Sequence, residues 1–292
     1  MPIAMKWFVI LFLCALSCAQ ADKGNQQNNT QVEHVVVQEE IFIDTTKNII
    51  SSRFVTPIDF ERVSLEANSF EFYLRNVSLN KHGSSVHYFN GGIKKDRDVY
   101  LAVVDKSIGK KDLHQCADAV MRLRADFFYE KQRYDEIHFN FTNGFRVDFS
   151  QWRKGKRIVL NGNSTTWVQS VQPSVNEESY WKYLEQIFMY AGTLSLDREL
   201  ISVELQDMKI GDVFIKGGSP GHAVIVVDMI INKSGQKKFM LAQSYMPAQE
   251  IQILRNPANK VKDNPWYELN DFEILSTPEW SFTSNQLKRF ED

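Results

Sequence analysis

The sequence predicts an α+β protein in which an antiparallel β-meander packs against one amphipathic helix. Three observations support this prediction. Residues 210–254 alternate short β-branched runs with turns rich in Gly, Asn and Pro, which is typical of a meander. Residues 113–131 carry apolar side chains at helical spacing, and residues 137–149 alternate as a hairpin does. Because each apolar face needs cover, we expect these elements to pack together.

The chain begins with a segment typical of a secretory signal peptide. Lys6 precedes an apolar run from Trp7 to Leu16, and Ala19-Gln20-Ala21 follows the small-x-small cleavage pattern. The apolar run is shorter than the roughly 20 residues that a membrane-spanning helix needs. We therefore expect residues 1–21 to be removed on export, which leaves a periplasmic or extracellular protein.

A second interpretation of the same segment involves Cys18. This residue follows Ala15-Leu16-Ser17 and could instead be a lipoprotein cysteine, in which case a lipid on Cys18 would be the one attachment to a membrane. Loss of the segment by cleavage after Ala21 removes Cys14 and Cys18. Cys116 then remains as the single cysteine, so no intrachain disulfide can form.

Composition and charge limit the classes of function. The chain has 292 residues, 43% of them hydrophobic, and a formal net charge of −2. Loss of Lys6 makes the mature charge more negative, which argues against a nucleic-acid partner. We expect residues 22–50 to form a polar tether followed by a first strand region, and residues 51–292 to form a single α+β domain. His82 and His87 do not have a metal-ligand spacing, and we expect no metal and no cofactor.

The strongest predicted helix runs from Leu113 to Lys131. Asp112 and Gln115 form an Asp version of the capping box, which predicts that the helix begins at Asp112. Cys116 would then lie in the first turn, where the helix dipole stabilises a thiolate. The alternative is that Cys116 is a small core residue. The apolar stripe comprises Leu113, Cys116, Ala117, Val120, Leu123, Phe127 and Phe128.

Further elements flank this helix. Residues 69–75 predict a short helix, and residues 99–104 a strand. The hairpin of residues 137–149 keeps its apolar side chains on one face only if Thr142-Asn143-Gly144 is a three-residue loop with Gly144 left-handed. Residues 179–191 predict a second helix that ends at Gly192. This hairpin and helix form an insertion between Cys116 and the meander.

The meander places one histidine at the start of a strand. His222 follows a Gly-Gly-Ser-Pro-Gly turn and begins a β-branched run. If Ile231 pairs with Gln236, Val224 faces Gln243, and Gln243 becomes the diagonal neighbour of His222, about 7 Å away. A slip of one residue would present Ser244 instead.

These residues are suited to thiol chemistry. An imidazole beside an amide has the features of a general base and its orienting partner, and Cys116 supplies a nucleophile. We expect Cys116 and His222 to form a thiolate–imidazolium pair, with Gln243 holding the ring through one nitrogen.

Two resemblances follow from these motifs. GDVFI followed by GHAVIV resembles the signature of papain-like cell-wall amidases and endopeptidases, the NlpC and CHAP groups. In those groups a cysteine opens a helix, a histidine begins the second strand of a sheet, and a polar residue on the next strand orients it. The resemblance implies a papain-like core and, residue by residue, the roles of Cys116, His222 and Gln243.

A second resemblance is more specific and covers about residues 53–290. DLHQCADAVMRLRADFFY, HFNFTNGF, YAGTLSL, GDVFIKGGSPGHAVIVVDM and LAQSYMPAQ are similar to an uncharacterised family of exported bacterial proteins, domain of unknown function 4846. This resemblance implies relatives but no activity.

Three functions stay open at this point. The first is an exported papain-like cysteine amidase or endopeptidase whose substrate is the peptidoglycan stem peptide or a related amide. The second is a non-catalytic module of the same fold that binds cell-wall peptides or glycans, with the aromatic side chains of Trp266, Tyr267 and Trp280 as platforms. The third is a lipid-anchored structural or assembly protein.

Overall fold

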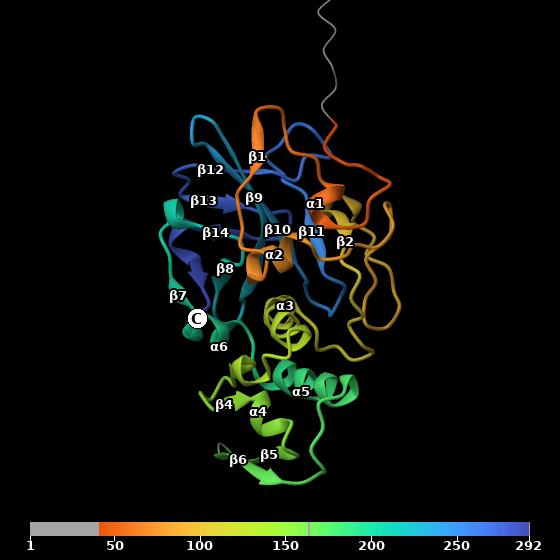
Figure 1. Cartoon of the computed structure of the whole chain (residues 1–292), viewed down its shortest axis with the longest axis vertical. Coiled ribbons are helices and arrows are strands. Elements are labelled where there is room, and N and C mark those ends of the chain that lie inside the picture. Colours follow the sequence, from red (N-terminus) through yellow and green to blue (C-terminus); the bar gives the residue numbers. More distant parts are fainter. Residues whose placement is uncertain (1–40, 163, 292) are drawn as a thin grey trace, which may run out of the picture. The chain divides into compact units, whose positions relative to one another are not determined.

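The computed structural model describes residues 41–162 and 164–291 (Figure 1). The described residues all belong to one compact unit. The expected signal peptide, the lipoprotein cysteine Cys18 and the tether up to residue 40 therefore lie outside the described residues. The part expected to hold a first strand has a short helix, α1 (Ile50–Arg53), and isolated bridges at Ile43 and Ile49.

A nine-stranded antiparallel sheet is the centre of the fold. Seven strands follow one another across it in the order β2-β11-β10-β9-β8-β15-β7, while β1 pairs with β9 and β12 pairs with β10. The predicted meander is confirmed as the four neighbouring strands β8 to β11 (Figure 1). The bounds are β1 (Phe60–Arg62), β2 (Tyr100–Val103), β7 (Ile201–Ser202), β8 (Val213–Lys216), β9 (His222–Asn232), β10 (Lys237–Gln243), β11 (Gln252–Leu254), β12 (Tyr267–Leu269) and β15 (Leu287–Arg289).

Helices and small hairpins complete an α+β architecture. Both α2 and α3 pack on β9, the longest strand of the sheet, and α5 packs on α3. The predicted packing of a helix against the meander is thus confirmed. The remaining elements are α2 (Phe70–Arg75), α3 (Cys116–Glu130), α4 (Phe149–Trp152), α5 (Glu177–Tyr190), α6 (Thr193–Glu199), and the paired strands β3 (His138–Asn140) with β4 (Arg146–Asp148), β5 (Lys156–Asn161) with β6 (Ser164–Gln169), and β13 (Ile274–Ser276) with β14 (Ser281–Thr283).

The predicted hairpin has the expected loop. Phe139 pairs with Val147, and the Phe141 N–H donates to the Phe145 carbonyl at 2.9 Å. Gly144 has a φ of 85°, the left-handed conformation that a three-residue loop requires there. Phe139, Phe141 and Val147 are buried on one face, as the alternation predicts.

The start of α3 differs from the prediction. The N-cap is Gln115, and the Asp118 carboxylate accepts the Gln115 N–H at 2.9 Å, so the capping pair lies three residues later than expected. Asp112 instead accepts the Ala248 N–H at 2.7 Å and ties the loop before α3 to the loop after β10. As a result, Cys116 is the first residue of the helix.

The pairing of β9 with β10 also differs from the prediction at the turn. Ile231 pairs with Lys237 rather than with Gln236, which shifts the register by one residue. A bulge then follows, because Met240 pairs with Asp228 but Leu241 pairs with Val226, which leaves Val227 without a partner. Beyond the bulge, Ala242 pairs with Ile225, so Gln243 falls where the predicted register had placed it.

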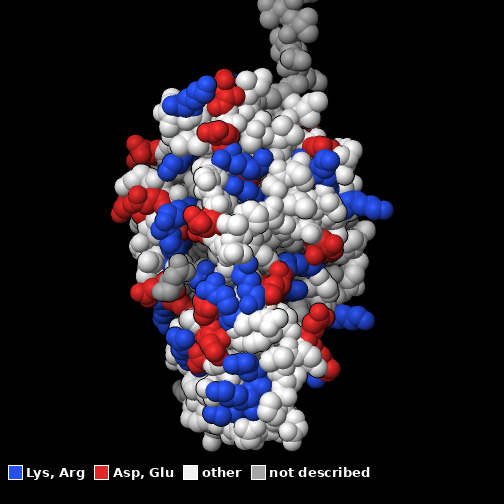
Figure 2. All heavy atoms as spheres, in the orientation of Figure 1, with Lys and Arg blue, Asp and Glu red and all other residues white. Residues whose placement is uncertain are grey.

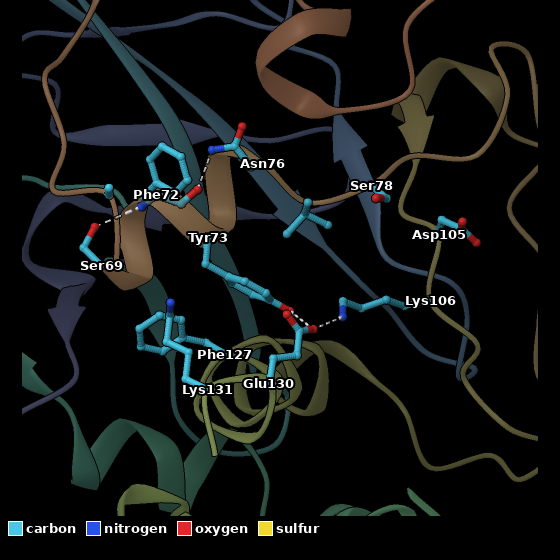
Figure 3. Close-up of a pocket in the computed structure, with 12 residues that line it drawn as sticks. Ser69, Phe72, Tyr73, Asn76, Ser78, Asp105, Lys106, Phe127, Glu130 and Lys131 are labelled. Carbon is cyan, nitrogen blue, oxygen red and sulfur yellow. Dashed lines mark hydrogen bonds and ion pairs between the residues drawn. The ribbon is translucent and has the colours of Figure 1, made fainter. Parts of the chain in front are cut away.

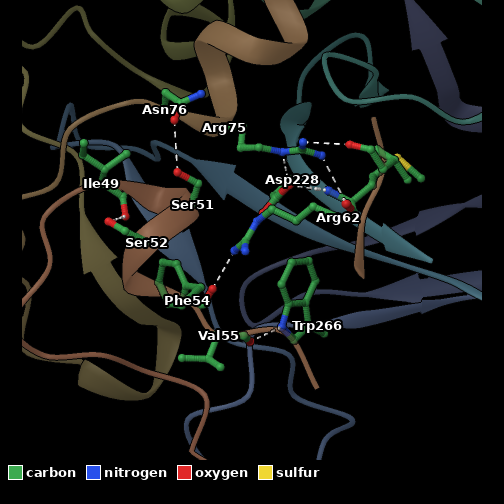
Figure 4. Close-up of polar contacts among 12 residues, drawn as sticks. Ile49, Ser51, Ser52, Phe54, Val55, Arg62, Arg75, Asn76, Asp228 and Trp266 are labelled. Atoms are coloured by element: carbon green, nitrogen blue, oxygen red, sulfur yellow. Dashed lines mark hydrogen bonds and ion pairs between the residues drawn. The ribbon is translucent and has the colours of Figure 1, made fainter. Parts of the chain in front are cut away.

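A buried ion pair network joins α2, β1 and β9. The Asp228 side chain is fully buried, and its carboxylate accepts from Arg75 at 2.6 Å and from Arg62 at 2.8 Å (Figure 4). Arg62 also donates to the Phe54 carbonyl, and Arg75 to the Val63 carbonyl. Two guanidinium groups around one carboxylate compensate the desolvation of the buried charge.

The outer surface mixes both signs of charge. Basic and acidic side chains lie beside one another over most of the face in Figure 2, in keeping with the nearly balanced net charge. Among residues 41–162 and 164–291, no helix has the length and apolar character that crossing a membrane demands.

Removal of the buried carboxylate should destabilise the fold strongly. We expect Asp228→Ala to lower the free energy of unfolding by about 3–5 kcal/mol, because Arg62 and Arg75 would lose their shared counter-charge. The matched control is Glu268→Ala, which removes an exposed carboxylate 2.8 Å from Lys238 and should cost less than about 1 kcal/mol. Urea denaturation measures both values. Equal losses in the two variants would contradict this account of the network.

Candidate functional site

His222 is the first residue of β9 and is almost fully buried. The residue follows the turn of Gly217 to Gly221, and it pairs with Lys216 on β8. Gly221 allows this turn to close, since an added Cβ would lie 2.4 Å from Thr193 Oγ1 and 2.5 Å from the Gly218 carbonyl oxygen. The start of β9 therefore packs tightly against the start of α6, and a side chain at position 221 could not fit unless the backbone shifted.

Gln243 makes a direct hydrogen bond to His222. The distance from His222 Nε2 to Gln243 Oε1 is 2.8 Å, and both side chains are 1% exposed. An amide oxygen only accepts, so Nε2 must carry the proton and Nδ1 keeps its lone pair. Ser244, the alternative neighbour, points elsewhere, and its hydroxyl lies 2.7 Å from the Gln249 carbonyl oxygen.

Cys116 meets the same end of β9 from the start of α3. Its side chain is 6% exposed. Burial raises the pKa of the thiol, and the backbone N–H groups of Ala223, Ala117 and Cys116 itself offset only part of that rise. Ala223 directly follows His222 in β9, so Cys116 contacts the backbone one residue from the histidine that is hydrogen-bonded to Gln243. The helix start also leaves its first N–H groups without partners within the helix.

The expected thiolate–imidazolium pair does not match the electrostatics of this site. Burial, together with the nearby Asp118 carboxylate, raises the pKa of Cys116 to about 11. Burial, with a contribution from the charge of Lys94, lowers the pKa of His222 to about 4. Burial also raises the pKa of Asp118 to about 8. At neutral pH the Cys116 thiol and the His222 imidazole are therefore both neutral.

Two charged residues that the sequence did not point to extend the site. Glu279 accepts from Gln243 Nε2 at 2.6 Å and from Lys94 Nζ at 2.6 Å. Lys94 is 4% exposed and also donates to Gln249 Oε1 at 3.1 Å. Lys94 lies before β2, and Glu279 lies in the loop between β13 and β14, so only the tertiary fold brings them together.

Aromatic rings enclose the imidazole. The rings of Tyr245, Trp280 and Phe282 lie 4.8, 5.4 and 5.9 Å from that of His222, between centroids. Burial raises the pKa of Tyr245, and the charges of Glu279 and Cys116 raise it further. Trp280 and Tyr245 are both partly exposed, whereas His222 is buried.

Trp266 and Tyr267 do not take the platform role expected of them. They are 1% and 3% exposed. The Trp266 indole donates to the Val55 carbonyl (Figure 4), and the Tyr267 hydroxyl donates to the Arg255 carbonyl. A buried ring cannot stack on a ligand, and the expectation is wrong for these two residues because both serve the core. Trp280 alone of the three expected platforms touches the candidate site.

A hollow on the molecule lies apart from this site. A cavity of about 440 Å³ lies between α2 and α3, where Tyr73, Lys106 and Glu130 point toward one another (Figure 3). Its lining includes none of Cys116, His222 and Gln243. Within the part of the chain that the structure describes, no group of three or more His, Cys, Asp and Glu side chains could hold a metal ion.

Comparison with known proteins identifies the family. A family model described as domain of unknown function (4846) matches residues 50–289, well over half of the chain, and the chain belongs to that family. No curated protein and no solved structure matches the chain.

The buried thiol should react slowly with alkylating agents at neutral pH. The thiolate is the reactive form, and its population falls as the pKa rises. With a pKa of about 11, Cys116 in the folded protein should be labelled by iodoacetamide at pH 7 more than about tenfold more slowly than in the urea-unfolded chain, and faster as pH rises. Mass spectrometry of the Cys116 peptide measures both rates. Equal rates at pH 7 would contradict the neutral resting thiol.

Proposed function

We propose that this member of the family is an exported cysteine hydrolase, papain-like in its site, that cleaves amide bonds of peptidoglycan stem peptides. One observation carries the proposal. The Cys116 thiol, at the first position of α3, faces the backbone of Ala223, directly after a buried histidine whose Nε2 hydrogen bonds to Gln243 at 2.8 Å. Nucleophile, base and orienting group are the three parts that such a reaction needs.

The proposed reaction uses the free ring nitrogen of His222. Nδ1 takes the proton of the Cys116 thiol while the sulfur forms a bond to the amide carbonyl carbon. The carbonyl oxygen becomes an oxyanion, which the N–H groups at the start of α3 stabilise. The imidazolium returns its proton to the departing amine as the C–N bond breaks. Water, deprotonated by Nδ1, then hydrolyses the thioester and frees the thiol.

A neutral resting pair suits a general-base route. Because the pKa of Cys116 is raised to about 11 and that of His222 is lowered to about 4, proton transfer at rest is strongly unfavourable. The oxyanion that forms on attack supplies the negative charge that the imidazolium then balances. The thiol is thus unreactive until a carbonyl group is bound, which protects it from oxidation outside the cell.

The substrate class rests on the expected export and on the resemblance to cell-wall amidases. A secretory signal on residues 1–21 would bring the enzyme beside the wall, where stem peptides are an abundant amide. The exposed edge of Trp280 beside His222 offers an apolar contact for a peptide side chain.

Burial of the site favours a second candidate function. With Cys116 6% and His222 1% exposed, a ligand reaches the pair only if Tyr245 or Trp280 moves. A module that binds wall peptides or glycans through Trp280 would need no such motion. A structural or assembly role with a lipid on Cys18 is a third proposal, and it rests on the sequence around that residue.

Single substitutions in the site should separate the roles. We expect purified protein to release amino groups from peptidoglycan or its stem peptides, Cys116→Ala to abolish release, and His222→Ala to lower kcat by at least about 100-fold. Gln243→Ala should lower it less, because orienting a base contributes less than supplying one. The matched control, His87→Ala, removes an exposed imidazole and should leave the rate unchanged. Full turnover by Cys116→Ala would refute the nucleophile; no release by the wild type would favour the binding module.

A further inference from the structure

Glu279 makes two hydrogen bonds through one oxygen. Its Oε2 accepts from Gln243 Nε2 and from Lys94 Nζ, each at 2.6 Å. The ammonium of Lys94 is buried against Gln249, whose Oε1 also accepts from Gln252 Nε2 at 3.0 Å. Gln243, Glu279 and Lys94 are therefore linked by hydrogen bonds, and Glu279 Oε2 is the acceptor that Gln243 and Lys94 share.

The chemistry of the groups fixes the direction of each hydrogen bond. A carboxylate paired with an ammonium only accepts, so the Gln243 amide must turn its NH₂ group toward Glu279. The amide oxygen then faces His222, and it also only accepts. The one ring arrangement that satisfies both contacts has the proton on Nε2 and the lone pair on Nδ1. Neutral imidazole otherwise can carry its proton on either nitrogen.

We propose that Glu279 is a positioning residue that selects the protonated ring nitrogen of His222, acting through the Gln243 amide. It touches neither Cys116 nor the imidazole in this role. Lys94 contributes because its ammonium only donates hydrogen bonds, so the atom at the position of Glu279 Oε2 must be an acceptor. The inference rests on the proposed function for its catalytic meaning, since Nδ1 is the nitrogen that must accept the thiol proton there. The selection of the tautomer itself is a property of the folded protein with or without turnover.

The tautomer can be measured directly. ¹⁵N NMR of the protein labelled in its histidine rings distinguishes the two neutral tautomers at pH 7, and His222→Ala assigns the signals. The wild type should show His222 with the proton on Nε2. Glu279→Met removes the acceptor, so Gln243 can turn either way, and we expect a mixture of tautomers. Glu279→Gln should keep the wild-type signals, because Lys94 selects the oxygen of the new amide and that oxygen still accepts from Gln243.

The two variants separate positioning from a structural role. Both remove the negative charge beside Lys94, so an effect of that charge alone would be the same in both. Under the proposal, kcat falls by about 2- to 10-fold in Glu279→Met with little change in KM, and Glu279→Gln stays near the wild type. Glu268→Met, which removes the exposed carboxylate beside Lys238, is the matched control and should alter neither signal nor rate. A single Nε2–H tautomer in Glu279→Met, or a mixture in Glu279→Gln, would overturn the proposal.

A donor at the same position gives an independent test. In the double variant Lys94→Met with Glu279→Lys, the new ammonium can only donate, so Gln243 must turn its oxygen outward and its NH₂ group toward His222. The His222 proton should then move to Nδ1. Signals that stay at the Nε2–H position in the folded double variant would overturn the inference even if Glu279→Met does not fold. The expected tautomer changes without amide hydrolysis in the wild type would leave the inference standing and refute only the proposed function.

Discussion

The irregularity between Met240 and Leu241 on β10 decides which side chain faces His222. If the register found before Met240 continued along β10, Ser244 would lie beside the imidazole. The unpaired Val227 on β9 shifts the pairing by one residue, so Gln243 lies there instead. The hydrogen bond of 2.8 Å between Gln243 and His222 depends on this bulge, and so does the link to Glu279. A β-bulge that re-aims one side chain at a site is a recurring use of this device. The orientation of the imidazole thus follows from strand pairing.

Burial gives the site its resting state. The same aromatic rings and β-branched strands that form the core leave little solvent at Cys116 and His222, so charge separation between them is costly. The charged groups, Lys94 and Glu279, instead form an ion pair that reaches His222 only through Gln243. The network therefore orients the imidazole without charging it. Under the proposed function, such a site would react with a bound carbonyl group and resist small reagents in water.

The sequence predicted the parts of this fold that have local or periodic signals. Hydrophobic alternation identified the strands from Val213 to Leu254, and the hairpin loop with Gly144 follows from its own apolar pattern. The start of α3 was misplaced because Asp112 and Gln115 match a capping box as well as Gln115 and Asp118 do. The bulge, Lys94 and Glu279 have no local signal, since each arises from contacts between residues far apart in the chain. The prediction of a ligand platform fails for Trp266 and Tyr267, because an aromatic cluster has the same sequence pattern whether it is packed in the core or exposed.

The central claim is that the Cys116 thiol attacks a bound carbonyl group with His222 as its base. It is tested most directly by ¹³C NMR of a peptide aldehyde, built on a stem peptide and labelled at the carbonyl carbon, in the presence of the protein. The account predicts that the labelled carbon becomes a hemithioacetal on the wild type, to a smaller extent on His222→Ala, and not at all on Cys116→Ala. A carbon that remains aldehyde and hydrate at saturating protein, or an adduct that persists in Cys116→Ala, would contradict it.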